Sequence, residues 1–262
     1  MPRLLPLAVM LAISAVAGLA LAQFGPQAEP APRRSGLSFM SPALQALQTD
    51  DTQNPAMLAV QDGAQLWQQV EGPAGKACVS CHGSAERSMR GVAARYPAIV
   101  APLGPVNLAG RINQCRQQFQ GAAAWPAEHP KALALAAYVG LQSRGLPVAP
   151  PPGAAMAALQ AQGQALWQQR LGQLNLACSQ CHDGLAGQRL AGALIPQGHA
   201  TGYPIYRLEW QGLGSLQRRL QACMTGVRAQ PFDADAPEWL ALEAWLAQRA
   251  AGMAVETPAV RP

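Results

Sequence analysis

The stretch Cys-Val-Ser-Cys-His at residues 78–82 and the stretch Cys-Ser-Gln-Cys-His at residues 178–182 decide how this chain of 262 residues folds. In each stretch the two cysteines are spaced to bond the two vinyl groups of one porphyrin, and the following histidine can ligate its iron from the proximal side. The sequence therefore predicts two haem c cofactors. The thioether bonds would come from Cys78, Cys81, Cys178 and Cys181, and the proximal ligands would be His82 and His182.

Two other interpretations of these motifs explain less of the pattern. A zinc knuckle would hold both motifs within one small unit, and a redox CxxC pair has no use for a fixed histidine after it. The chain contains only six cysteines and four histidines, so two copies of a five-residue pattern would be a large coincidence.

The N-terminus has the features of a secretory signal peptide. Residues 4–22 form an uncharged apolar run behind Arg3, and the run ends in the small-residue pattern Ala-Leu-Ala before a predicted cleavage site at Gln23. An uncleaved membrane anchor is the alternative, because the run is nearly long enough to span a bilayer. No later segment is apolar enough to do so. We therefore expect an exported protein of the periplasm, where haem c is attached.

The charge balance argues against nucleic acid as a partner. Lys and Arg number 19 and Asp and Glu 14, a net charge of +5, but the basic residues are scattered rather than striped with aromatics. Such mild basicity is compatible with a small anionic substrate or an acidic partner, and also with an ordinary solvated surface.

The composition predicts an all-α fold. Ala, Gln and Leu dominate, aromatic residues make up 5% of the chain, and runs of β-branched residues are nearly absent. Proline-rich stretches interrupt the helical pattern before residue 43 and again between Gly145 and Gly153. We expect a signal peptide at 1–22, a flexible leader at 23–42, a first cytochrome c-like domain at 43–146, a Pro-rich linker at 147–153, a second such domain at 154–252 and a tail at 253–262.

The two domains are tandem repeats of one another. Nine residues of the first motif region recur 100 positions later, among them Trp67 as Trp167, whereas Cys115 recurs 108 positions later as Cys223. The second copy therefore contains extra residues before its lone cysteine. Each copy has an opening amphipathic helix, a haem loop, a helix with one cysteine and a closing helix, the order of a small cytochrome c domain. We expect the paired tryptophans to pack against the haems rather than to carry electrons.

Cys115 and Cys223 remain after porphyrin attachment and occupy equivalent places in the repeats. Three interpretations compete: a disulfide between them, which separate domains make geometrically improbable; inert buried thiols; or a distal ligand for each haem iron. We favour distal ligation, because each iron needs a sixth ligand and the repeat places a soft one identically twice. Methionine is the rival ligand, but Met224 points about 100° away from Cys223 on a helix, and the first repeat has Arg116 there.

Arg219 stands four residues before Cys223 and therefore one turn away on the same helical face. A guanidinium there can stabilise a thiolate and hold an oxyanion beside the sulfur through a bidentate contact. Arg111 stands in the same relation to Cys115, so contacts to haem propionates or helix packing would explain both arginines as well. His199 is a weaker candidate: it lies in the extra segment of the second repeat, where a role near that haem is open.

At these residues the chain resembles SoxA, the dihaem cytochrome subunit of the bacterial thiosulfate-oxidising Sox complex. The resemblance covers both domains, and it is most specific in the second CxxCH, in the segment GYPIYRLEWQ at residues 202–211 and in the Arg219-x-x-x-Cys223 pair. The resemblance implies that Arg219 and Cys223 are catalytic, with Cys223 as a thiol or a persulfide. It also implies that the axial pairs are His82 with Cys115 and His182 with Cys223.

The same resemblance implies an oxidative sulfur transfer. Thiosulfate would be joined to a cysteine of the carrier SoxY in the SoxYZ pair, and two electrons would leave through SoxX, a monohaem cytochrome c. A thiol or persulfide sulfur can accept sulfur from an anion and then be attacked by a carrier thiolate, so the residues suit this chemistry. Two other classes stay open. A dihaem electron-transfer cytochrome would be expected to use Met ligands, and a dihaem peroxidase would be expected to have an open or displaceable haem site.

The surroundings of the two lone cysteines differ in sequence. Both repeats have the CxxCH, the lone cysteine and the preceding arginine, but only the second has a longer segment with Tyr203, Tyr206, Arg207 and Trp210 before its cysteine helix. Duplicated sites diverge in their surroundings when one of them takes up a substrate. We therefore expect the chemistry to take place in the second repeat.

Overall fold

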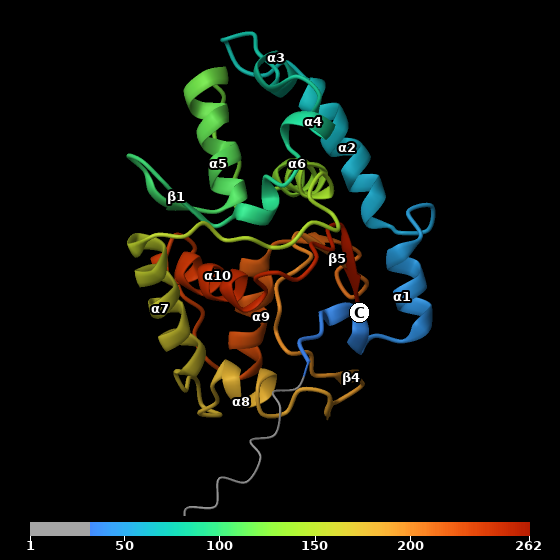
Figure 1. Cartoon of the computed structure of the whole chain (residues 1–262), viewed down its shortest axis with the longest axis vertical. Helices are drawn as coiled ribbons and strands as arrows, with labels where there is room; N and C mark the ends of the chain where they lie inside the picture. The colour runs from blue at the N-terminus through green and yellow to red at the C-terminus, as the bar shows by residue number, and fades with distance from the viewer. Residues whose placement is uncertain (1–31) are drawn as a thin grey trace, which may run out of the picture. The chain divides into compact units, whose positions relative to one another are not determined.

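Two pairs of crossed helices form the framework of residues 32–262, the part of the chain that the computed structural model describes. In the first repeat α2 (Ala56–Gln68) packs against α6 (Pro130–Leu141), and in the second α7 (Ala154–Gln168) packs against α10 (Pro237–Arg249). Figure 1 shows α3, α4 and α5 near the first pair and α8 and α9 near the second. These are the opening and closing helices that the repeats predict. The predicted signal peptide lies outside the described residues.

A glycine lies at the centre of each helix crossing. A Cβ atom on Gly63 would lie 2.2 Å from the carbonyl oxygen of Ala134, and one on Gly163 would lie 1.9 Å from that of Ala241. The helices of each pair therefore touch backbone to backbone, an approach that only glycine permits. Because the same two positions meet in both repeats, the crossings support the register that the sequence offsets predict.

Apolar side chains on these helices form the cores. The first core contains Val60, Trp67, Leu135 and Val139, and the second contains Met156, Leu159, Ala241 and Ala244 with a neighbouring cluster of Met224, Trp239 and Leu242. None of the helices within residues 32–262 is long and apolar enough to cross a membrane.

Along the chain, the motif helices come between the opening and closing helices of each repeat. The CxxCH motifs form α3 (Cys78–His82) and α8 (Cys178–His182), and the lone cysteines lie on α5 (Leu108–Cys115) and α9 (Leu216–Gly226). A π-helical turn, η3 (Arg116–Gln120), continues α5 directly. The remaining helical elements are η1 (Gly36–Phe39), α1 (Pro42–Thr49), α4 (Ala85–Ser88) and η2 (Ala93–Arg95).

Seven short strands in the described residues make the fold helix-rich rather than strictly all-α, which corrects the expectation from composition. They are β1 (Ala98–Val100), β2 (Gly104–Val106), β3 (Arg189–Leu190), β4 (Ala193–Leu194), β5 (Ile205–Arg207), β6 (Gly212–Gly214) and β7 (Ala259–Arg261). β1 pairs with β2 and β3 with β4, while β5 pairs antiparallel with β6 and parallel with β7. Strands of two or three residues are too short to show an alternating pattern in a sequence.

The C-terminal segment is hydrogen-bonded along both of its halves. Gly145 N donates to Val255 O and Val148 N donates to Met253 O, each at 2.8 Å, so the start of the linker runs antiparallel to the beginning of the tail. The last residues then form β7, which lies beside β5 of the second repeat. The C-terminus consequently lies near β5, as Figure 1 shows.

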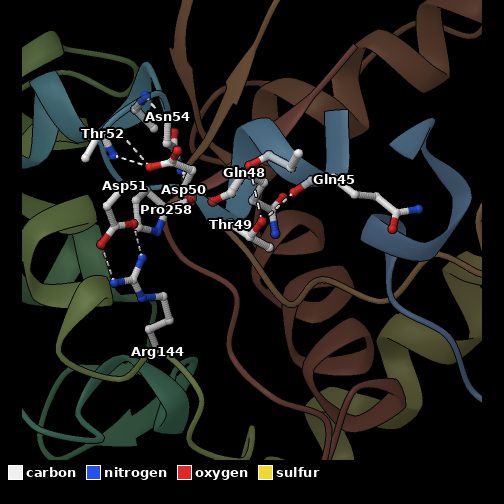
Figure 2. A network of polar contacts seen from close by, with 11 residues as sticks. Gln45, Gln48, Thr49, Asp50, Asp51, Thr52, Asn54, Arg144 and Pro258 are labelled. Carbon is white, nitrogen blue, oxygen red and sulfur yellow. Dashed lines mark hydrogen bonds and ion pairs between the residues drawn. The ribbon is translucent and has the colours of Figure 1, made fainter. Parts of the chain in front are cut away.

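A polar network ties the region of α1 to this C-terminal segment. Asn54 donates one hydrogen bond to the carbonyl oxygen of Gln48 at 3.2 Å and another to that of Pro258 at 3.0 Å. Figure 2 shows this network together with Arg144, whose two terminal nitrogens contact Asp51 at 2.6 and 2.7 Å. Gln48 and Asn54 are buried, so these bonds satisfy polar groups that would otherwise lose their water without compensation.

The described part of the predicted leader also makes contacts. Arg33 Nη1 donates to the carbonyl oxygen of Ala251 at 2.8 Å, residues 36–39 form a turn of 3-10 helix, and Phe39 is buried. The domain boundaries drawn from the sequence stay predictions.

Candidate haem sites and the cavity beside the second motif

The second CxxCH motif presents a histidine whose orientation is fixed. His182 Nδ1 donates to the carbonyl oxygen of Pro196 at 2.7 Å, and the imidazole ring lies 5.4 Å from the Trp167 ring at an interplanar angle of 31°. Burial lowers the pKa of His182, so the neutral imidazole is favoured. With Nδ1 held by the carbonyl, Nε2 is the nitrogen left for a metal, the usual arrangement of a histidine ligand.

A cavity of about 800 Å³ opens beside this histidine. Its walls include His182 from α8, Arg219 and Cys223 from α9, and Tyr203 from the segment before β5. A volume of this order is typical of a cofactor site. The structure thus brings both predicted ligands of the second haem, and the predicted anion-holding arginine, to one cavity.

The attachment cysteines lie close to the lone cysteine of the same repeat. Burial raises the pKa of the Cys178 thiol to about 11, and the charge of Cys223 contributes in the same direction. In the first repeat burial raises the pKa of Cys78, again with a contribution from Cys115. In both repeats the charge of the lone cysteine therefore acts on an attachment cysteine of its own repeat. All six thiols are free, so the structure contains no disulfide between Cys115 and Cys223.

The residues present fit a covalently attached haem c. In the second repeat His182, with one ring nitrogen left free, and Cys223, a soft sulfur ligand, line the same cavity, and the attachment cysteines Cys178 and Cys181 lie on the helix that carries His182. In the first repeat His82 is exposed, and its ring lies 5.7 Å from that of Trp67 at 37°, nearly the geometry of the second pair. Trp67 and Trp167 are both buried, and their packing against haems stays a prediction.

The two equivalent arginines have different environments. Arg111 donates a hydrogen bond to the side chain of Gln114 on the same helix, which occupies its guanidinium. Arg219 lines the cavity, and no hydrogen bond or ion pair among residues 32–262 engages its guanidinium. The cavity wall also contains Arg189, Arg207 and Arg261. Arg207 pairs with Glu209 at 2.5 Å and Arg261 with Glu256 at 2.8 Å, so the positive charge without a carboxylate partner in the described residues comes from Arg189 and Arg219. Such charges favour anions.

One part of the second site has a counterpart that the sequence comparison missed. Tyr203-Pro204 leads into the β5–β6 hairpin and α9, and Tyr96-Pro97 leads into the β1–β2 hairpin and α5 in the same way. Burial raises the pKa of Tyr203 to about 12, with Arg219 and Cys223 as the next influences; burial also raises that of Tyr96, with Arg111 and Cys115 as the next ones. The repeated Tyr-Pro dipeptide, 107 positions apart, was the available signal.

The extra residues of the second repeat lie before this dipeptide, and they cover the proximal histidine. They include β3, β4 and the carbonyl of Pro196 that holds His182. A Cβ atom on Gly198 would lie 2.8 Å from the Trp167 ring and 3.2 Å from Cγ of His182, so this segment packs directly on the ligand. The expectation that Tyr203 belongs to the extra segment was therefore wrong.

The two remaining candidates have clear places. His199 lines the cavity, and burial, with Arg249 nearby, lowers its pKa to about 4, so its ring is neutral at physiological pH. Met224 is buried against Trp239 and Leu242 in the core. It points away from the cavity that Cys223 lines, as the helical geometry predicts.

Two CxxCH motifs on a duplicated, helix-rich scaffold define a c-type cytochrome. The family model "SoxA/TsdA, cytochrome c domain" matches residues 62–148 and 162–255, one match for each repeat. The chain belongs to this family, and within it to the SoxA proteins, which confirms the resemblance.

Several SoxA proteins match most of the chain. The L-cysteine S-thiosulfotransferase subunit SoxA of Pseudaminobacter salicylatoxidans is 38% identical over 87% of this chain and 80% of its own length. That of Rhodovulum sulfidophilum is 35% identical with the same coverage. A chain in the crystal structure of SoxXA from P. pantotrophus superposes with a TM-score of 0.84 at 31% identity, covering 88% of this chain and 87% of that one.

Proposed function

We propose that this chain is a periplasmic dihaem subunit of an L-cysteine S-thiosulfotransferase, which joins thiosulfate oxidatively to a cysteine of a SoxYZ-type carrier. The single observation that carries the proposal is the meeting of His182, Arg219 and Cys223 at one cavity. The names of the relatives support the same activity. His82 and Cys115 would hold the iron of the first haem, and His182 and Cys223 that of the second.

The proposed reaction balances in two steps. The sulfane sulfur of thiosulfate forms a disulfide bond with the sulfur of Cys223, and two electrons are released. A carrier thiolate then attacks that sulfane sulfur, which forms the carrier S-thiosulfonate and returns Cys223 as a thiolate. If Cys223 is a persulfide, the same two steps would take place on its outer sulfur instead of on Sγ.

The side chains of the cavity have distinct tasks in this scheme. Arg219 would hold the sulfonate oxygens through paired hydrogen bonds and so orient the sulfane sulfur toward Cys223, one helical turn away. Arg189, which has no carboxylate partner in the described residues, would attract the dianion into the cavity or neutralise a propionate. A bound haem would supply the one-electron acceptor next to the sulfur.

The electrons would leave through a SoxX-type monohaem cytochrome c. A SoxXA complex is among the structures that this fold matches, which supports such a partner. Purification of the holoprotein from its native periplasm should therefore yield a heterodimer with a second cytochrome. A monomer that never binds one would favour a standalone electron carrier.

The direct test is thiosulfate-dependent reduction of an added cytochrome c, measured with and without the carrier protein. The proposal requires reduction that depends on the carrier and a carrier mass increased by one thiosulfonate. Reduction without carrier modification would favour plain electron transfer, and a haem spectrum that responds to peroxide rather than thiosulfate would favour a peroxidase.

Axial ligation is tested by Cys115→Met and Cys223→Met in the holoprotein. Each change should alter the low-spin ferric EPR signal of one haem only. Unchanged spectra in both variants would contradict thiolate ligation.

A further inference from the structure

The start of α9 is held by a residue of the other repeat. Glu128, from the loop before α6 in the first repeat, accepts a hydrogen bond from the backbone N–H of Ser215 on both carboxylate oxygens at 3.3 Å. Ser215 is the N-cap of α9, and its own hydroxyl accepts from Arg218 N at 3.1 Å. A carboxylate at this position also interacts favourably with the positive end of the helix dipole.

The same carboxylate reaches a side chain of the first helical turn. Arg218 Nη1 lies 4.0 Å from Glu128, and its guanidinium carbon lies 4.2 Å from the centroid of the Trp210 ring. Trp210 in turn packs on the hairpin, since a Cβ atom on Gly214 would lie 2.2 Å from its ring. Glu128 therefore contacts the point where the hairpin turns into the helix that carries Arg219.

The loop that presents Glu128 is itself anchored to the cysteine helix of the first repeat. Trp125 exchanges hydrogen bonds of 2.8 and 2.9 Å with the Asn113 side chain, and the guanidinium of Arg116 lies 3.4 Å from the centre of its ring. His129 stacks on Trp125 at 5.9 Å and 8°. Glu128, between these anchors, has a left-handed φ of +63°. Packing contacts therefore fix both the loop that carries Glu128 and the start of α9 that it contacts.

We propose that Glu128 is a positioning residue for α9: a carboxylate of the first repeat sets the first turn of the helix that carries Arg219 and Cys223 in the second. Through this contact the first domain supports the second site whether or not its own haem takes part in the chemistry. The kinetic part of the inference rests on the proposed function, whereas the structural part does not.

The test compares Glu128→Ala and Glu128→Gln with Asp62→Asn, a control that removes an exposed carboxylate from α2 of the same repeat. Each variant is prepared as holoprotein with both haems confirmed. Hydrogen exchange of the peptides covering 215–226 reports the first turn of α9 directly, and EPR reports each haem. Thiosulfate turnover, split into kcat and KM, is measured in parallel.

In Glu128→Ala we expect faster exchange confined to the first turn of α9, a shifted EPR signal of the second haem only, and a fall in kcat/KM of about three- to fivefold. Gln keeps an acceptor oxygen but not the charge, so Glu128→Gln should lie between Ala and wild type. Exchange at α9 equal to that of Asp62→Asn would overturn the proposal, as would faster exchange throughout residues 33–262. If exchange and EPR change as expected but the wild type does not turn over thiosulfate, the proposed function fails and the positioning role stands.

Discussion

The helices α5 and α9 carry the same Arg-x-x-x-Cys pattern, yet the structure surrounds them differently. In α5 the guanidinium of Arg111 is hydrogen-bonded to Gln114, and His82 of the same repeat is exposed. In α9 the guanidinium of Arg219 lines a cavity, and the facing His182 is partly buried. A duplicated scaffold can therefore preserve the lone cysteine and the preceding arginine while the two copies surround them differently.

The difference comes largely from the extra residues of the second repeat. They place the Pro196 carbonyl on His182 and Gly198 over the ring, and they add part of the cavity wall. Buried, hydrogen-bonded ligands have fixed geometry, and fixed geometry is what a site needs to act on a substrate. Substitutions at matched positions in the two repeats should therefore distinguish residues that support the fold of both repeats from residues that act in the proposed reaction.

The largest difference should come from the lone cysteines. Cys223→Ala should abolish thiosulfate turnover, because the proposed bond change takes place on its sulfur, whereas Cys115→Ala should leave much of it. Turnover of pure holoprotein with both haems confirmed is the measurement. Equal losses in the two variants would show that the active site is not confined to the second repeat.

The matched arginines should differ next. Arg219→Ala should reduce the transition-state stabilisation calculated from kcat/KM by about 1.5 to 3 kcal/mol, which is what a charge-assisted contact to an oxyanion contributes. Arg111→Ala should reduce it much less. Arg219→Lys should recover little, because an ammonium offers no planar fork. If both alanine variants lose activity equally, the arginines serve a shared role such as haem propionate binding.

Much of this comparison could be predicted from the sequence, because the features that the repeats share are encoded in short stretches of residues. The motifs, the lone cysteines and the crossing helices are short patterns that recur at fixed offsets, so each copy supports the other. The strands were missed because pairs such as β3 and β4 are only two residues long. The contact of Glu128 with Ser215 joins residues 87 positions apart, and nothing in either local segment indicates it. Tyr96-Pro97 was visible but was overlooked among the changing offsets.

The helix crossings offer a test of the shared scaffold. Gly63→Ala and Gly163→Ala would each push a methyl group onto a backbone carbonyl, so each should lower the free energy of unfolding by about 3 kcal/mol. Gly226→Ala is the matched control, because a Cβ atom there meets open space. Denaturant unfolding measures all three. A tolerated Gly163→Ala would mean that the two crossings are not equivalent.

The smallest effect concerns Glu243, a buried carboxylate of α10 that accepts a hydrogen bond from Asn107 at the start of α5. Burial raises its pKa to about 7 from an ordinary value of 4.5. The folded chain therefore binds this proton more tightly than the unfolded chain does, so the stabilisation is complete below about pH 4.5 and is lost as the pH rises through 7.

Glu243→Gln keeps an acceptor for Asn107 but cannot ionise. Between pH 5 and pH 8 the unfolding free energy of the variant should therefore fall by about 2 kcal/mol less than that of the wild type. Denaturant unfolding at the two pH values is the measurement, with Glu238→Gln, which changes a partly exposed carboxylate at the first turn of the same helix, as the control. An unfolding free energy that falls equally in wild type and Glu243→Gln would place the pH dependence elsewhere, and the contact between α10 and α5 would then be independent of pH.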